Sequence, residues 1–328
     1  MRAAWFESFG KAGDVLEVGE QPDPVPRQGE VLVRLATSGV NPSDVKKRAG
    51  SFPNLLEDGL VIPHSDGAGV IEAVGAGVAE RRVGERVWVY QAQYGRRHGT
   101  AAGLVAIDER RAPPLPAPAS FDVGACLGIP AMTAHRCVHA DGPVAGQTVL
   151  VTGGAGRVGW YAIQWAKRAG ATVIASASTN DDADACRGIG ADAVVNHREA
   201  GWSRALLDAT QGNRIDRVVD VEFGANLPEV LEVLRTGGTI ATYSSTQVTE
   251  PKLPFLRMMY QDLTVRFVIV YAMPEAAKSQ AIRDINEALE SSALVHRVAR
   301  RYELNEIAAA HEAIESGRLR GCVVVDTE

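Results

Sequence analysis

The chain has 328 residues, of which 46% are hydrophobic and 23% charged, a composition typical of a globular protein with about two domains. Its net charge is −6 and its longest basic cluster is only 96–98, which argues against nucleic-acid binding. No apolar run is long enough to span a membrane, and the N-terminus lacks a signal-peptide core. We therefore expect a cytoplasmic protein with no membrane partner.

The first 123 residues are rich in short strand patterns, such as 29–39 and 84–92, separated by Gly and Pro. They predict an antiparallel, barrel-like domain. The Pro-rich segment 113–118 then marks a stiff crossover. The four cysteines lack the CxxC spacing of a zinc site or a disulfide framework, so we expect small buried thiols at Cys126, Cys137, Cys186 and Cys322.

The most informative motif is VTGGAGRVG at 151–159, which places Gly154, Gly156 and Gly159 between a strand pattern and a helix pattern. Glycines in this context let a phosphate approach the backbone, and the following helix offers free N–H groups and its positive dipole end. The motif therefore predicts a pyrophosphate-binding loop.

Strand patterns alternate with helix patterns from residue 146 onward, at 148–152, 172–176, 193–196, 217–221, 239–243 and 263–271. This alternation predicts an α/β domain over 124–272, with a doubly wound parallel sheet of the Rossmann type. A helix pattern at 274–290 and a strand pattern at 321–325 follow. We expect residues 273–328 to return to the first domain, and the active site to lie in the cleft between domains.

The choice between NAD and NADP is predicted from the residues at the end of the second strand of this domain. Enzymes that prefer NAD commonly carry an acidic residue there, but 174–178 reads IASAS. The missing acid favours NADP. Asp181, Asp182 and Asp184 follow directly, and we interpret them as cap and first-turn residues of the next helix. Arg157 either pairs with a cofactor phosphate or faces solvent.

These features and several motifs make the chain resemble the zinc-independent quinone oxidoreductases, the zeta-crystallin branch of the medium-chain dehydrogenase/reductase superfamily. The motifs lie at 39–50 (GVNPSDVKKRAG), 63–78, 84–87, 99–102, 127–135 and 196–199, together with the glycine loop, Gln164 and Lys167. The resemblance implies a GroES-like catalytic domain, a Rossmann domain, an NADPH-dependent reductase of a small conjugated acceptor, and a homodimer or tetramer.

The resemblance also implies roles for single residues. Asn41 and Asp44 are expected near the nicotinamide, with Thr133 in contact with it. Residues expected at the pyrophosphate are Gly154, Ala155, Gly156, Arg157, Val158 and Gly159. Those expected around the adenosine ribose and its phosphate are Ser176, Ser178 and His197, and those after the fifth strand are Tyr243, Ser244 and Ser245.

The chain departs from the family in its expected pocket. Many members have tyrosines where Lys46 and Phe52 stand, and a lysine where Asp181 stands. Candidate proton donors are Lys46, Tyr243 and Tyr271, each with a structural alternative; the run 46–48 can equally face water.

A metal is not expected. Zinc-dependent relatives have a cysteine ligand where Asn41 stands and a histidine where Ser65 stands, and the cysteine-rich structural lobe is missing. We interpret His64 as a structural histidine and Asp66 as a hydrogen-bonding residue. Without a metal, a conjugated acceptor is easier to reduce than a simple carbonyl compound.

Three functions stay open on the sequence. The first is an NADPH-dependent quinone reductase, and the second a reductase of activated alkenes such as enones, 2-alkenals or acryloyl thioesters. The third, drawn from some relatives, is a lens structural or RNA-binding protein. The apolar segment 263–271 is expected at the sheet edge, where it would join two subunits into a homodimer.

Overall fold

The computed structural model describes residues 1–327 and divides into two compact units. One unit comprises Met1–Ile129 and the chain from Ile282 onward, and the other comprises Pro130–Ala281. Sequence reasoning placed the two junctions at 123 and 272. The second junction falls inside helix α10, Glu275–Glu290. We call Pro130–Ala281 the Rossmann unit and the remainder the GroES-like unit.

The Rossmann unit is built on a six-stranded sheet in the order β12-β11-β10-β7-β8-β9, in which every pairing is parallel. Its strands are β7 (Thr148–Val151), β8 (Thr172–Ala177), β9 (Ala193–Asn196), β10 (Ile215–Asp220), β11 (Leu234–Thr242) and β12 (Thr264–Phe267). The chain runs outward from β7 in one direction and from β10 in the other, so the switch point lies between them. The predicted doubly wound sheet is confirmed.

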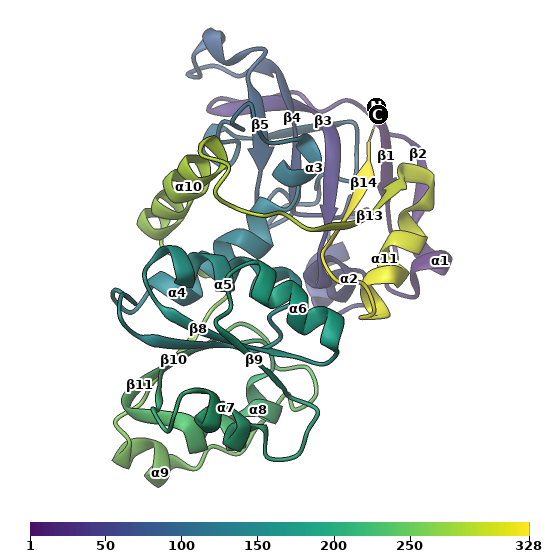
Figure 1. Cartoon of the computed structure of the whole chain (residues 1–328). Coiled ribbons are helices and arrows are strands. Elements are labelled where there is room, and N and C mark those ends of the chain that lie inside the picture. Colours follow the sequence, from purple (N-terminus) through teal and green to yellow (C-terminus); the bar gives the residue numbers. More distant parts are fainter. Residues whose placement is uncertain (328) are drawn as a thin grey trace. The chain divides into compact units, whose positions relative to one another are not determined.

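Helices cover both faces of this sheet. They are α4 (Met132–His139), α5 (Arg157–Arg168), α6 (Asn180–Gly188), α7 (Trp202–Ala209), α8 (Phe223–Val233) and α9 (Phe255–Tyr260). Figure 1 shows α5 and α6 on one face and α7 and α8 on the other. Apolar side chains alternate between these faces, and Leu150, Ile174, Val218 and Ile240 are buried in one core with α7 and α8. Each such side chain contributes about 1.5–3 kcal/mol by leaving water.

The last strand is shorter than predicted. The pattern at 263–271 predicts one long strand, but only Thr264–Phe267 pairs with β11. Strand β11 ends at Thr242, whose carbonyl accepts a last bond from the N–H of Val268, so the following residues have no neighbouring strand. The chain therefore turns into a 3-10 segment, Val270–Ala272.

The GroES-like unit contains a sheet in the order β13-β14-β3-β4-β5, with β6 also paired to β3, and a separate β1-β2 pair. Its strands are β1 (Arg2–Trp5), β2 (Glu17–Glu20), β3 (Glu30–Val40), β4 (Asp66–Val74), β5 (Arg86–Val89), β6 (Leu104–Asp108), β13 (Val298–Glu303) and β14 (Cys322–Asp326). Its further helices are α1 (Ala12–Val15), α2 (Pro42–Arg48), α3 (Phe121–Gly124) and α11 (Ile307–Glu315).

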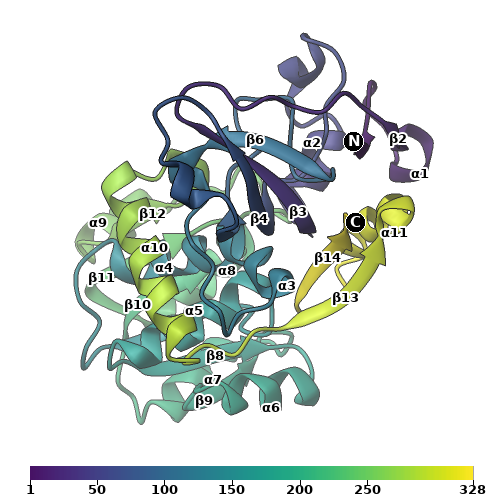
Figure 2. The same ribbon diagram turned by 90° about the horizontal axis from the view of Figure 1, so that it is seen from above.

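The C-terminal segment is part of this unit's sheet. Strand β14 pairs antiparallel with β3, from Val323 opposite Val40 to Asp326 opposite Thr37. Figure 2 shows α11 beside β13 and β14. Val323 and Val325 share a core with Ile307 of α11. The last strand and helix therefore share a core with strands from the first part of the chain.

The four cysteines are free and buried, as predicted. Among residues 1–327, the structure contains no helix of the length and apolarity needed to cross a membrane.

Candidate functional site

The glycine loop connects β7 to α5 at the switch point of the Rossmann sheet. Gly153 has a φ of 61°, which lets the chain turn sharply after the strand. The loop is fixed to β8, because the N–H of Gly153 donates to Ser176 Oγ at 3.0 Å and the N–H of Gly154 donates to the Ser176 carbonyl at 2.9 Å. Helix α5 then begins at Arg157, with Gly156 as its N-cap.

Two of the three fingerprint glycines are required by packing. A Cβ at Gly159 would lie 2.4 Å from the carbonyl oxygen of Gly153, and one at Gly154 would lie 2.9 Å from Ala175 Cβ. The helix can therefore begin close to the strand only without these side chains. The N–H groups of the first turn of a helix have no partner within that helix. The loop thus fits a dinucleotide pyrophosphate, with Ala155, Gly156, Arg157 and Val158 at the helix start.

The residues predicted for the adenosine end lie at the ends of β8 and β9. Ser178 and His197 are half-buried, and the N–H of His197 donates to the Ala177 carbonyl at 3.3 Å, so the two strand ends are neighbours. Ser176 is buried and its hydroxyl accepts the bond from the glycine loop. Its side chain therefore stabilises the loop.

The aspartates that follow belong to helix α6, as interpreted from the sequence. Thr179 caps the helix, because its Oγ1 accepts the N–H of Asp182 at 3.1 Å. Asp181 is exposed in the first turn, and Asp184 pairs with Arg187 at 2.7 Å. Carboxylates in a first turn are stabilised by the positive end of the helix dipole.

The segment after β11 lines a hollow of about 450 Å³ in the Rossmann unit. Its walls include Tyr243, Ser244, Ser245, Phe223, Phe267 and Ile269. Burial raises the pKa of Tyr243 well above its usual value, so this phenol keeps its proton at neutral pH. Ser245 Oγ accepts the N–H of Gly224 at 2.9 Å.

The two other residues predicted in this unit are buried. Thr133 lies in α4, and Tyr271 lies in the 3-10 segment after β12.

In the GroES-like unit, Asn41 and Asp44 lie together at the start of α2. Asn41 is the N-cap, and its N–H donates to Asp44 Oδ2 at 2.8 Å. Its side-chain Nδ2 donates to Asp66 Oδ2 at 2.9 Å. Asp66 Oδ2 also accepts the N–H of Ile129 at 2.8 Å, whereas its Oδ1 is buried with no partner among the described residues. Asn41 and Asp44, predicted from the resemblance, thus share a cluster with Asp66.

The three basic residues that follow, 46–48, differ in their exposure to solvent. Lys46 is exposed, but Lys47 and Arg48 are buried, so the interpretation of the whole run as a solvated face is wrong for the latter two. On a helix, residues three apart share a face, which places Lys47 on the side of Asp44. Lys47 Nζ donates to the Gln93 carbonyl at 3.3 Å. Arg48 pairs with Glu315 of α11.

Burial changes the acidity of this cluster, which we define as Asn41, Asp44, Lys47 and Asp66. Desolvation raises the pKa of Asp44 to about 6 and that of Asp66 to about 8, with Lys47 opposing both shifts. Desolvation lowers the pKa of Lys47, which the two carboxylates partly oppose. Since both hydrogen bonds to Asp66 end on Oδ2, its proton at neutral pH is assigned to Oδ1. Sequence reasoning missed Lys47, although its spacing from Asp44 was a usable signal.

A second buried chain of bonds begins at the carbonyl of Asp66. Thr100 Oγ1 donates to it at 2.6 Å, which leaves Ser38 Oγ to donate to Thr100 at 2.8 Å. His64 Nδ1 therefore donates to Ser38 at 2.8 Å, and its Nε2 accepts from His311 Nε2 at 2.9 Å. Both nitrogens of His64 have protein partners, as a structural histidine requires. Within residues 1–327, no three His, Cys, Asp or Glu side chains group as metal ligands.

Comparison with known proteins identifies the family. Residues 27–117 match the family described as alcohol dehydrogenase GroES-like domain, and residues 158–287 match zinc-binding dehydrogenase. Quinone oxidoreductase of Homo sapiens is 30% identical, over 97% of this chain and 94% of its own. A 2-haloacrylate reductase of a Burkholderia species is 28% identical, over 92% and 91%. A mycobacterial protein solved in complex with NADPH is 28% identical, covers 99% of this chain and 100% of its own, and has a TM-score of 0.87. The chain therefore belongs to the quinone oxidoreductase family of the medium-chain dehydrogenase/reductase superfamily.

Proposed function

We propose that this chain is an NADPH-dependent quinone oxidoreductase, which transfers a hydride to a quinone or a related conjugated carbonyl acceptor without a metal. The observation that carries the proposal is the glycine loop at the switch point of a parallel sheet. Similarity to quinone oxidoreductases over 97% of the chain supports it. In this proposal the Rossmann unit binds the cofactor and the GroES-like unit serves the acceptor.

The Rossmann unit fits NADPH, which when bound supplies the hydride. The N–H groups of Ala155, Arg157 and Val158 would bind its pyrophosphate, while that of Gly156 donates to the Gly153 carbonyl at 2.9 Å and closes the turn. Ser178 and His197 would bind its adenosine end. No acidic residue ends β8, which leaves room for a 2'-phosphate. Thr133, Ser244 and Ser245 are assigned to the nicotinamide half.

The acceptor also requires a proton, because a hydride and a proton together convert a quinone to a hydroquinone. We assign that proton to the buried cluster of Asn41, Asp44, Lys47 and Asp66. Asp66 keeps a proton at neutral pH, and Asn41 holds its other carboxyl oxygen. A cationic Lys47 would stabilise negative charge that develops on the acceptor oxygen. Lys46, Tyr243 and Tyr271 stay candidate donors.

The same proposal excludes a catalytic zinc. Asn41 is used to bind Asp66, and His64 is bonded at both ring nitrogens, so neither is free to ligate a metal. Elemental analysis of the purified protein should find no stoichiometric zinc, and a chelator should leave the rate unchanged. A rate lost to chelator and restored by zinc would contradict this.

The experiment that tests the function is a panel of acceptors. Oxidation of NADPH is followed with quinones, enones and enoyl thioesters, and we expect the highest kcat/KM with a quinone. NADPH is expected to bind at least tenfold more tightly than NADH, about 1.4 kcal/mol. No turnover with any conjugated acceptor would refute the reductase, and equal binding of NADH would refute the cofactor preference.

A reductase of activated alkenes is the second candidate, because the chain is also similar to 2-haloacrylate reductase over 92% of its length. Hydride addition to the alkene carbon pushes charge onto a distant carbonyl or carboxylate oxygen, so the same cluster would serve it. A higher kcat/KM for 2-alkenals or haloacrylates than for quinones would favour this candidate.

We also propose a homodimer in the cytoplasm. Strand β12 is at the edge of the Rossmann sheet; its last residue, Phe267, is 71% exposed and Ile269, just after it, is 54% exposed. Exposed apolar edges favour pairing with a second copy. Light scattering should report twice the chain mass of 34.9 kDa. A monomer at micromolar concentration would contradict the dimer.

A further inference from the structure

A small basic hollow lies in the GroES-like unit, and the proposed reaction does not use it. It encloses about 280 Å³ and is lined by Pro24, Val25, Arg27, Glu30, Arg96, Arg97, His98 and Ala106. Residues 96–98 are the longest basic cluster of the sequence. Arg96 and Arg97 of this cluster are half-buried. The hollow therefore brings together Arg27, from the segment before β3, and the loop 96–98, which is distant from it in the sequence.

The cations of this hollow have no carboxylate partner at ion-pair distance within residues 1–327. Arg96 donates to the carbonyl of Ala106, and Arg97 donates to the carbonyl of Asp58. Carbonyl oxygens satisfy N–H groups but leave the positive charge uncompensated. The side chain of Glu30 is the acidic one in the lining, and its Oε2 accepts the backbone N–H of Arg27 at 2.9 Å.

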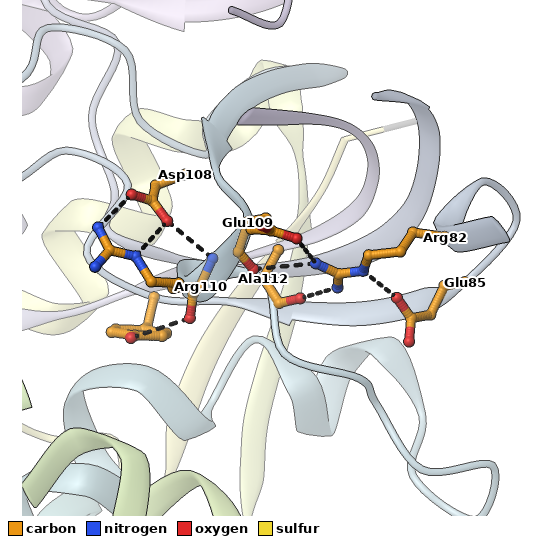
Figure 3. Close-up of polar contacts among 7 residues, drawn as sticks. Arg82, Glu85, Asp108, Glu109, Arg110 and Ala112 are labelled. Carbon is orange, nitrogen blue, oxygen red and sulfur yellow. Dashed lines mark hydrogen bonds and ion pairs between the residues drawn. The ribbon is translucent and has the colours of Figure 1, made fainter. Parts of the chain in front are cut away.

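Two other arginines of the same unit are paired with carboxylates, as Figure 3 shows. Arg82 Nε donates to Glu85 at 2.7 Å, and Arg110 holds Asp108 through Nε at 2.9 Å and through a second nitrogen at 2.6 Å. Arg96 and Arg97 thus differ from Arg82 and Arg110 in having, among the described residues, only carbonyl oxygens as partners.

The positive groups in and around the hollow also repel one another. Burial lowers the pKa of Arg96, and although Glu30 opposes this, Arg111 and Arg27 lower it further by repulsion. Burial, Arg97 and Arg96 likewise lower the pKa of His98. Like charges gathered in a partly buried hollow cost free energy that a bound anion would offset.

We propose that this hollow binds the phosphate group of a small anionic ligand. Planar guanidinium groups match phosphate oxygens in paired hydrogen bonds, and the three arginines of the hollow outnumber its single carboxylate. The site also connects to the acceptor cluster, because Gln93 Nε2 donates to the Arg96 carbonyl at 2.8 Å while the Gln93 carbonyl accepts from Lys47.

The test titrates inorganic phosphate into the full-length protein by calorimetry, at constant ionic strength. Saturating NADP⁺ is present, so that the cofactor's own phosphate sites are occupied. We expect saturable binding by the wild type and at least tenfold weaker binding by Arg96→Met and by Arg97→Met. Arg110→Met is the matched control, because it removes a paired, exposed arginine from the same unit and should bind as the wild type does.

Two further measurements keep the test decisive. Circular dichroism and NADPH binding identify a variant that fails to fold, and Arg97→Lys then takes its place. A lysine keeps the positive charge but cannot make the paired hydrogen bonds of a guanidinium group, so this variant should bind phosphate with intermediate affinity. If the phosphate belongs to the acceptor, inorganic phosphate should raise KM for a coenzyme A enoyl thioester and leave KM for a quinone unchanged; a free phosphate ligand should leave both unchanged.

The site would be overturned if the wild type showed no saturable phosphate binding. It would also be overturned if Arg110→Met weakened phosphate binding as much as Arg96→Met and Arg97→Met do. Either result leaves NADPH oxidation with quinones untouched, so the failure of this proposal is distinguishable from failure of the proposed function.

Discussion

The glycine loop of the Rossmann unit and the buried cluster of the GroES-like unit are built in different ways. The loop is local: residues 153–159 form a turn and a helix start, and in the proposed function it is their backbone that binds the cofactor. The cluster brings Asn41, Asp44 and Lys47 of helix α2 together with Asp66 of strand β4, and its acidity is set by burial. A local motif can be changed by one added methyl group, whereas a cluster responds to charge and pH. The predictions below test this difference.

The largest effect is expected at Gly159. In Gly159→Ala, the added Cβ would lie 2.4 Å from the Gly153 carbonyl oxygen, a backbone atom that cannot move without opening the loop. We expect NADPH affinity to fall by at least about a hundredfold, which corresponds to roughly 2.7 kcal/mol. Fluorescence titration of NADPH measures it. Gly188→Ala is the control, since a Cβ there meets nothing within 4 Å, and affinity should stay unchanged.

The buried histidines near the cluster, His64 and His311, should instead affect how folding stability depends on pH. Burial lowers the pKa of His311 to about 3 and that of His64 well below its usual value, so protonation favours the unfolded chain. The stabilisation by these neutral histidines is complete above pH 6.5 and is lost as the pH falls below it. For His311 the loss between pH 6.5 and 4.5 is about 2–3 kcal/mol.

Urea unfolding of the wild type and of His311→Gln at several pH values isolates this effect. The raised pKa of Asp66 acts with the opposite sign, since its neutral form favours the folded chain at low pH, but it is common to both proteins and cancels in the difference. The destabilisation caused by His311→Gln should therefore shrink as the pH falls from 6.5 to 4.5. A difference that does not vary with pH would show that His311 does not titrate on unfolding.

Two neighbouring lysines allow a sharper test of the cluster. Lys47 is buried beside Asp44 and Asp66, and Lys46 is exposed. Lys47→Met keeps the length of the side chain but removes its charge, and we expect kcat/KM for the best quinone to fall at least tenfold with NADPH affinity unchanged. Lys46→Met should cause the smaller loss. The reverse order would return the pocket role to Lys46, one of the candidate proton donors named from the sequence.

The rate profile with pH separates a chemical role of Lys47 from a structural one. In the wild type, kcat/KM should decline as the pH rises past about 8, when Asp66 loses its proton. Lys47→Met should move this decline to higher pH, because the cation that favours ionised Asp66 is gone. A variant that only loosens packing would lower the rate at every pH and leave the profile's shape unchanged.

The comparison also explains what the sequence could predict. The strands, the helix after the glycines and the cap of α6 depend on residues that are adjacent or periodic in the chain, so pattern alone indicates them. The end of β12 depends on where its neighbour β11 stops, and the burial of Lys47 depends on Gln93 and Asp66, which are distant in sequence. His311 reaches His64 only because the C-terminal segment returns to the first strands. Contacts between residues so far apart in the sequence can be identified only once the fold is known.

The smallest effect is expected at Asp181, where sequence and structure act together. This exposed aspartate stands in the first turn of α6, where the family often has a lysine for the 2'-phosphate. Asp181→Lys replaces a repelling charge by an attracting one, but an exposed pair gains only about 0.5–1 kcal/mol in water. We therefore expect NADPH to bind about threefold more tightly, with NADH unchanged and with the gain lost at high salt. Asp184→Lys is the matched control, because its carboxylate is already paired with Arg187. An equal gain in both variants would mean that only the net charge of the helix matters, and that Asp181 has no position at the cofactor phosphate.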